Sequence, residues 1–169
     1  MFYLLAIDPS LRSSGVASFV SDQTFHAYNF VSPKKFKGLD ALFWQMEILQ
    51  RYIASFVSAT VLGEKVDFRI VVEEQVDRGD NERMTEESFR YFSALPYAII
   101  PPNLYDKVVF VKPVQWKKQI PKEIHHKRIY DKEVKKGTHD MFIKDMQPDV
   151  MDAIGLGRWY LERNKSEPK

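Results

Sequence analysis

Apolar residues near the N-terminus fall into short continuous runs bounded by polar residues. Met1–Ile7 is apolar throughout and too short to span a membrane, so we expect a buried central strand there. Two further runs, Val16–Val20 and Thr24–Val31, are separated by three polar residues, a length that suits a hairpin. The pattern therefore predicts three antiparallel strands in a meander.

The rest of the chain alternates between helical and strand patterns. From Gly38 to about Thr60, apolar residues recur at helical spacing, which predicts an amphipathic helix packed on the sheet. The further predicted strands are Phe68–Val72 and Lys107–Lys112, and the further predicted helices are Thr85–Ile100, Pro121–Lys136 and Pro148–Glu162. Three strands followed by alternating helices and strands predict an α/β fold.

The composition is that of a globular protein without cysteine chemistry. A chain of 169 residues suits one domain, 1–169, and its 44% hydrophobic content is not that of a disordered chain. Cysteine is absent, which excludes disulfides and thiolate metal sites, so a metal would need oxygen or imidazole ligands. No apolar stretch reaches membrane length and no charged leader precedes one, so we expect a soluble, cytoplasmic protein.

Carboxylates follow two of the predicted strands. Asp8 comes directly after the first strand, and Glu73 and Glu74 end the fourth. A carboxylate at the end of a buried strand is costly to desolvate unless a cation lies beside it, which makes Asp8 a candidate metal ligand. The alternative is that Asp8 opens an Asp-Pro turn.

A further acidic pair begins the last predicted helix. Asp149 and Asp152 are three residues apart and therefore lie on one helix face. A divalent cation would relieve the repulsion between them, although both could instead be partners of the helix dipole. The small residues Ala153, Gly155 and Gly157 would let this helix lie close to the sheet, which draws its acidic end toward the strand ends.

Positive charge gathers in one segment although the net charge is only +2. Lys117–Lys136 holds eight lysines and arginines against three acids. Such an excess could bind a polyanion, and the alternative is an ordinary solvated helix face.

Three segments together resemble the acidic motifs of a known family: AIDPSLRSSGVA at Ala6–Ala17, EQV at Glu74–Val76 and QPDVMDAIGLG at Gln147–Gly157. They look like those of the RuvC family of Holliday-junction resolvases, in the RNase H-like superfamily, and the resemblance spans essentially the whole chain. It implies a five-stranded mixed sheet, with the first three strands antiparallel and helices on both faces. Ser10 replaces a family glycine, and the insert before the last helix is unusual. The short chain suggests a phage-type member, which would act in the host cytoplasm.

The resemblance also implies a metal site. Its ligands would be Asp8, Glu74, Asp149 and Asp152. They would hold two Mg²⁺ ions, for which Mn²⁺ can substitute, and the metal site would activate a water for phosphodiester hydrolysis. Lys117 would lie near the scissile phosphate. Glu73 competes with Glu74, because consecutive strand residues face opposite sides and one of them looks into the site; the Gln-Val that follows favours Glu74.

The implied partners are branched DNA and a second copy of the chain. We expect a homodimeric endonuclease of DNA recombination and repair that cleaves branched DNA, which means four-way junctions and could include flaps. The helix from Thr85 would form the dimer interface. The candidate DNA contacts are Arg12, Lys117, Lys118, Lys127 and Arg128, with Lys34, Lys35 and Lys37 able to track phosphates. The loop Arg78–Arg83 could enter a branch point, and His125 or His126 could contact DNA.

Three other functions are compatible with parts of this pattern. One is a broader flap, branched-DNA or RNA-hybrid nuclease on the same metal site. Another is a non-catalytic junction-binding module, against which the four retained carboxylates argue. The third is an actin-like ATPase, but the chain lacks an Asp-Gly-Gly phosphate loop and is too short for two such lobes.

Overall fold

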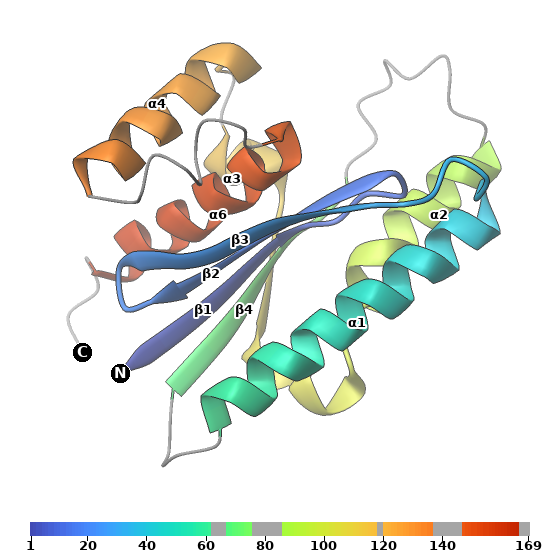
Figure 1. Ribbon diagram of the computed structural model, residues 1–169, viewed down its shortest axis with the longest axis horizontal. Coiled ribbons are helices and arrows are strands. Elements are labelled where there is room, and N and C mark those ends of the chain that lie inside the picture. Colours follow the sequence, from blue (N-terminus) through green and yellow to red (C-terminus); the bar gives the residue numbers. More distant parts are fainter. Residues whose placement is uncertain (62–66, 76–85, 118–119, 137–146, 166–169) are drawn as a thin grey trace.

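Five strands form one mixed sheet in the computed structural model, in the order β3-β2-β1-β4-β5 (Figure 1). The strands are β1 (Phe2–Asp8), β2 (Ser13–Val20), β3 (Gln23–Val31), β4 (Asp67–Glu73) and β5 (Val108–Val111). The structure describes residues 1–61, 67–75, 86–117, 120–136 and 147–165. The first three strands are antiparallel neighbours and the other two run parallel to β1, which confirms the predicted five-stranded mixed sheet with its first three strands antiparallel.

Helices cover both faces of the sheet. They are α1 (Leu39–Val61), α2 (Glu86–Ala98), α3 (Pro113–Trp116), α4 (Lys122–Lys135) and α6 (Pro148–Lys165), with a 3₁₀ helix η1 (Pro102–Lys107). Figure 1 shows α3, α4 and α6 on one side of the sheet and α1 and α2 on the other. Among the described residues, no helix combines the length and apolar character that a membrane span requires.

The central strand β1 is buried on both faces, as its continuous apolar sequence predicts. Leu4 and Ala6 belong to the core under α6, whereas Leu5 and Ile7 belong to the core under α1 and α2. All four side chains are fully buried. Because side chains alternate along a strand, Asp8 points to the α6 side, like Leu4 and Ala6.

Three local features differ from the sequence-based expectation. Strand β2 begins at Ser13 rather than Val16, because the buried Ser14 hydroxyl has hydrogen-bonding partners, the Ser10 carbonyl and Gln45 Oε1, each 2.9 Å away. The 3₁₀ helix η1 precedes β5 and the single turn α3 follows it. Each begins with a proline, which suits the first helical position because that position needs no N–H donor.

The amino-terminal end of α6 touches the sheet at a glycine. Gly15 of β2 is paired with Asp8 of β1, and a Cβ added at Gly15 would overlap the backbone carbonyl of Asp149. Further along the helix, a Cβ at Gly157 would overlap the ring of Phe19. Gly157 therefore lets α6 lie against β2, as the sequence predicted, whereas Gly155 faces α3 and α4, where an added Cβ would overlap Trp116 and Ile129. The approach at Gly15 brings the acidic end of α6 next to Asp8.

A buried ion pair fixes α4 onto α6. Arg158 of α6 donates to the carboxylate of Glu133 on α4, and these residues are 4% and 0% exposed. The same guanidinium reaches the hairpin between β2 and β3, where it donates to the Asp22 carbonyl and the Thr24 hydroxyl. Such a pair is costly to break because either charge alone would be left buried. The last turn of α4 is thereby held against α6.

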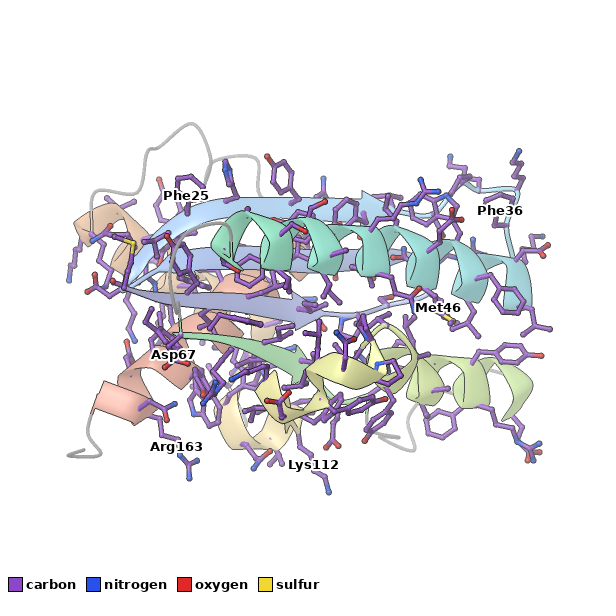
Figure 2. The ribbon with its side chains drawn as sticks, turned by 90° about the horizontal axis from the view of Figure 1, so that it is seen from below. Phe25, Phe36, Met46, Asp67, Lys112 and Arg163 are labelled. Atoms are coloured by element: carbon purple, nitrogen blue, oxygen red, sulfur yellow. The ribbon has the colours of Figure 1, made fainter. Side chains whose placement is uncertain are left out.

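The strands β1, β3 and β4 run in the same direction and end together. Phe25, near the start of β3, and Asp67, at the start of β4, lie at one end of the sheet (Figure 2). Phe36, beyond the end of β3, lies at the other. Asp8 and Glu73 therefore end their strands toward the segment 32–38.

We expect Gly15→Ala to lower the free energy of unfolding by about 3 kcal/mol or more, because the added Cβ must push the α6 backbone off the sheet. Gly38→Ala is the matched control: Gly38 has a φ of 52° and open surroundings, with Tyr91 at 3.9 Å, so backbone strain alone should cost about 1–2 kcal/mol. Urea unfolding measures both. Equal losses for the two variants would contradict the close approach of α6.

Candidate functional site

Two buried carboxylates lie side by side at the ends of β1 and β4. The strands are parallel neighbours in register, so Asp8 and Glu73 come at equivalent positions. They are 8% and 4% exposed. Both point to the α6 side, because Ala6 and Val71, two residues earlier on each strand, pack in the core under α6.

A third buried carboxylate reaches this point from α6. Asp152, 4% exposed, lies in the second turn of that helix and has three cationic or potentially cationic neighbours. Its Oδ1 lies 3.0 Å from His126 Nε2, and its Oδ2 lies 3.2 Å from Lys117 Nζ and 3.5 Å from Lys122 Nζ. Lys122 and His126 are four residues apart and so share one face of α4.

The single turn α3 carries two residues into contact with Glu73. The chain turns at Pro113 after β5, and the turn brings Trp116 and Lys117 back toward β4. Trp116 Nε1 donates to Glu73 Oε2 at 2.7 Å, and Lys117 Nζ donates to Glu73 Oε1 at 3.0 Å. Because Lys117 also contacts Asp152, its ammonium group bridges the strand end and the helix.

The electrostatics of this cluster follow from burial and from a shortage of positive charge. Burial, with Glu73 beside it, raises the pKa of Asp8 well above its usual value, although Lys117 opposes the rise. Burial also raises the pKa of Glu73. For Asp152 the effect of burial is outweighed by Lys117 and the His126 hydrogen bond, so its pKa is lowered. Burial would lower the pKa of Lys117, but Asp8, Glu73 and Asp152 raise it.

The preference for Glu74 in this cluster is corrected by the structure. The Glu74 carboxylate faces away from the cluster and accepts a hydrogen bond from the Tyr97 hydroxyl of α2, at 2.6 Å. Glu73 takes the position instead, because strand alternation allows one of the two to face α6 and the register with β1 selects Glu73. The following Gln75 donates to the Pro9 carbonyl at 2.6 Å, so it ties the end of β4 to the loop after Asp8.

Asp149 lies at the edge of the cluster. It is half-buried in the first turn of α6, where its backbone meets Gly15. Burial is the main cause of the raised pKa of Asp8, and the Asp149 charge adds to it less than Glu73 and Asp152 do. The structure thus gathers Asp8, Glu73 and Asp152 closely and leaves Asp149 beside them.

The predicted DNA contacts lie at the surface around the cluster. Arg12 is exposed, and its guanidinium donates to the Phe36 carbonyl at 2.5 Å. Lys127 and Arg128 are exposed on α4. Lys118 and the loop Arg78–Arg83 lie outside the described residues. Of the basic segment, Lys117, Lys122, Lys132 and Lys136 are ion-paired to carboxylates of this chain, which reduces its expected excess of charge.

Both histidines of α4 contact other side chains of this chain. His125 packs edge-on against Trp116, with ring centroids 5.1 Å apart, and burial lowers its pKa. His126 contacts Asp152. His126 was expected from the sequence as a candidate DNA contact, but it was not predicted that His126 and Lys122 contact Asp152 or that Trp116 contacts Glu73. The signal available in the sequence was the four-residue spacing of Lys122 and His126 on one helix face.

The donor chemistry of the cluster fits a hard divalent cation. Carboxylate oxygens are the ligands that Mg²⁺ and Mn²⁺ prefer, and three such groups are buried here. Among the described residues, no group of three or more Asp, Glu or His side chains is arranged so that it could hold a metal ion without rearrangement. Lys117 occupies the space between two of the carboxylates, and within the described part of the chain no side chain donates a hydrogen bond to Asp8.

Comparison with known proteins finds likeness in structure and not in sequence. No model of a protein family matches the sequence, and no curated protein sequence matches it significantly. Thermus thermophilus RuvC in complex with a Holliday junction substrate is similar with a TM-score of 0.66 and 12% identity, over 98% of this chain and 97% of that one. A second Thermus thermophilus RuvC structure gives a TM-score of 0.63 and 11% identity, over 99% of each chain. These similarities establish a shared fold.

We expect Asp8→Asn to stabilise the protein in metal-free buffer at about pH 8. Because the folded-state pKa of Asp8 is raised, the native state holds its proton more tightly, and stability is lost as the pH rises through that pKa. The gain should be on the order of 1 kcal/mol and should vanish below about pH 3, where Asp8 is protonated in both states.

Urea unfolding in EDTA at several pH values measures the effect. Asp131→Asn, at an exposed position on α4, is the control and should change little. An Asp8→Asn protein less stable than the parent at about pH 8 would show that the buried charge at this position is not costly.

Proposed function

We propose that this chain is a metal-dependent endonuclease that resolves four-way junctions or other branched DNA. The observation that supports it most is the burial of Asp8, Glu73 and Asp152, from two strands and a helix, near one another around Lys117. The fold that brings them together is shared with a RuvC structure bound to a Holliday junction substrate. Fold and carboxylate cluster together favour a nuclease over a non-catalytic binding module.

The metal ligands we propose are Asp8, Glu73 and Asp152, with Asp149 beside them. A bound Mg²⁺ or Mn²⁺ would supply an activated water and neutralise charge on the phosphate. Asp152, whose lowered pKa keeps it ionised at neutral pH, is ready to bind a cation. Trp116 holds the Glu73 carboxylate in place by its indole N–H.

Cationic side chains on α3 and α4 prepare the same point for a phosphate. Lys117, Lys122 and His126 lie within 3.5 Å of the Asp152 carboxylate. The Lys122 side chain is 58% exposed, so it can reach outward to a DNA strand, whereas those of Lys117 and His126 are 18% and 19% exposed. These residues would offset the negative charge of a scissile phosphate lying over the carboxylates.

A second basic surface lies beyond the ends of β1 and β3. The Arg12 guanidinium donates a hydrogen bond to the Phe36 carbonyl, and the Arg12 backbone carbonyl accepts one from Ser32 N at 2.8 Å. These two hydrogen bonds join the loop after β1 to the segment after β3. Lys34, Lys35 and Lys37 are exposed, and within the described residues no carboxylate pairs with them. With Lys127 and Arg128 of α4, they would contact the phosphate backbone on either side of the cluster.

The proposal includes a homodimer, because symmetric cleavage of a junction needs two sites. The predicted interface, the helix from Thr85, corresponds to α2, which lies on the face of the sheet opposite α6 (Figure 1). In such a dimer each chain would contribute one active site. A role in recombination and repair, and a phage-type origin, belong to the same proposal.

We expect Glu73→Gln to reduce cleavage of a synthetic four-way junction in Mg²⁺ by at least about 10²-fold, more than the loss typical of an outer partner of a metal ligand. Glu74→Gln is the matched control and should keep most of the activity, because Glu74 faces Tyr97. Asp8→Asn should abolish cleavage and leave junction binding largely intact. The reverse order of the two glutamate variants would contradict the site.

Parallel assays on a flap, a linear duplex and an RNA–DNA hybrid define the substrate class. Preferred cleavage of the junction supports the proposal. Preferred cleavage of the flap or the hybrid would replace junction resolution by a broader nuclease on the same site. Junction binding without cleavage in Mg²⁺ or Mn²⁺ would leave a binding module and overturn the enzymatic proposal.

We expect the double variant Lys34→Gln/Lys35→Gln to weaken junction binding and to reduce the slope of log affinity against log salt by up to about 2. The control is Lys132→Gln/Lys136→Gln, which also removes two charges but at lysines paired with Glu162 and Asp22. Electrophoretic mobility shifts in EDTA at several salt concentrations measure both. Equal slopes for the first variant and the parent would remove this surface from the DNA path.

A further inference from the structure

At the centre of the cluster, three buried carboxylates surround one ammonium group, that of Lys117. Asp8, Glu73 and Asp152 are all buried, and the Lys117 ammonium lies between two of them, 3.0 Å from Glu73 and 3.2 Å from Asp152. A buried carboxylate without a cation is strongly disfavoured. The position of Lys117 is therefore the place where a positive charge stabilises this arrangement most.

The geometry points to Lys117 as the internal cation of the metal-free site, which gives up its place between Glu73 and Asp152 when a divalent cation binds. This inference rests on the proposed metal-dependent function and adds a competition to it. The ammonium group contacts Glu73 Oε1 and Asp152 Oδ2, and a divalent cation held by Glu73 and Asp152 would compete with it for these two carboxylates. Both cannot occupy them at once, since the two cations would repel each other at close range.

Other cations near the cluster do not duplicate this role. Within the described residues, Lys122 and His126 contact Asp152, whereas the side-chain contacts of Glu73 are with Lys117 and Trp116. Lys122 is also farther from Asp152, at 3.5 Å. If Lys117 were removed, Glu73 would keep the neutral Trp116 donor and lose its cationic partner.

The position of Lys117 also allows its ammonium group to shift away from the carboxylates. It follows the single turn α3, and its ammonium is held on a flexible four-carbon chain. Its Nζ lies 4.8 Å from the centre of the Trp116 ring, so the indole face offers a second favourable contact to a displaced ammonium. A lysine released from the carboxylates would then lie beside them, where a phosphate could meet it.

The direct test is the chemical reactivity of the Lys117 amine in the full chain, with and without metal. Acetylation by a small reagent, quantified by peptide mass spectrometry, is compared in EDTA and in saturating Mg²⁺, where Mg²⁺ binding is checked by calorimetry. We expect the Lys117 rate to rise several-fold with Mg²⁺. Lys132, whose side chain is 54% exposed and paired with Glu162, is the internal control and should not change. An unchanged or lower Lys117 rate with Mg²⁺ bound would overturn the inference.

A substitution gives an independent readout. Lys117→Met should bind Mg²⁺ about tenfold more tightly than the parent, because the competing charge is gone. Lys122→Met is the matched control and should tighten binding less, because Lys122 contacts one of the two carboxylates. Equal tightening by the two variants, or none, would overturn the competition. Absence of Mg²⁺ and Mn²⁺ binding to all three proteins would overturn the metal proposal itself, whereas metal binding without Lys117 release would overturn this inference alone.

Discussion

The arrangement of this protein depends on the cost of burying three carboxylates next to one another. Asp8, Glu73 and Asp152 are each less than one-tenth exposed and come together at one end of the sheet. Repulsion and desolvation oppose such a cluster, which is why the pKa values of Asp8 and Glu73 are raised. Lys117 offsets part of that cost in the metal-free protein. A cluster that remains short of positive charge is one that a divalent cation would stabilise.

Backbone geometry determines which acids meet. The parallel register of β1 and β4 places Asp8 beside Glu73, and the absence of a side chain at Gly15 lets the α6 backbone approach the same point. The turn α3 returns Lys117 to the strand ends. The buried pair of Arg158 and Glu133 fixes the last turn of α4 on α6, and Lys122 and His126 in its first two turns contact Asp152. Each of these is a packing feature, and together they build an electrostatic site.

Much of the fold could be predicted because its signals are local. The continuous apolar run of β1 and the period of α1 result from burial, which leaves a direct pattern in the sequence. The burial of Asp8 and Asp152 near one another was likewise predictable from a strand end and a helix start. The choice between Glu73 and Glu74 was not, because it depends on the register between strands some sixty residues apart, and the Gln-Val that favoured Glu74 instead accompanies a contact with the loop at Pro9. The contacts of Lys122 and His126 with Asp152 were missed because they depend on how α4 lies over α6.

The central claim, that folding joins Asp8, Glu73 and Asp152 into a site for a divalent cation, is tested most directly by locating such a cation. Anomalous diffraction from crystals of the full chain grown with Mn²⁺ would do so. We expect a manganese peak within coordinating distance of the Asp8, Glu73 and Asp152 carboxylates, with Glu74 still hydrogen-bonded to Tyr97. A protein that binds Mn²⁺ elsewhere, or through Glu74 in place of Glu73, would contradict it.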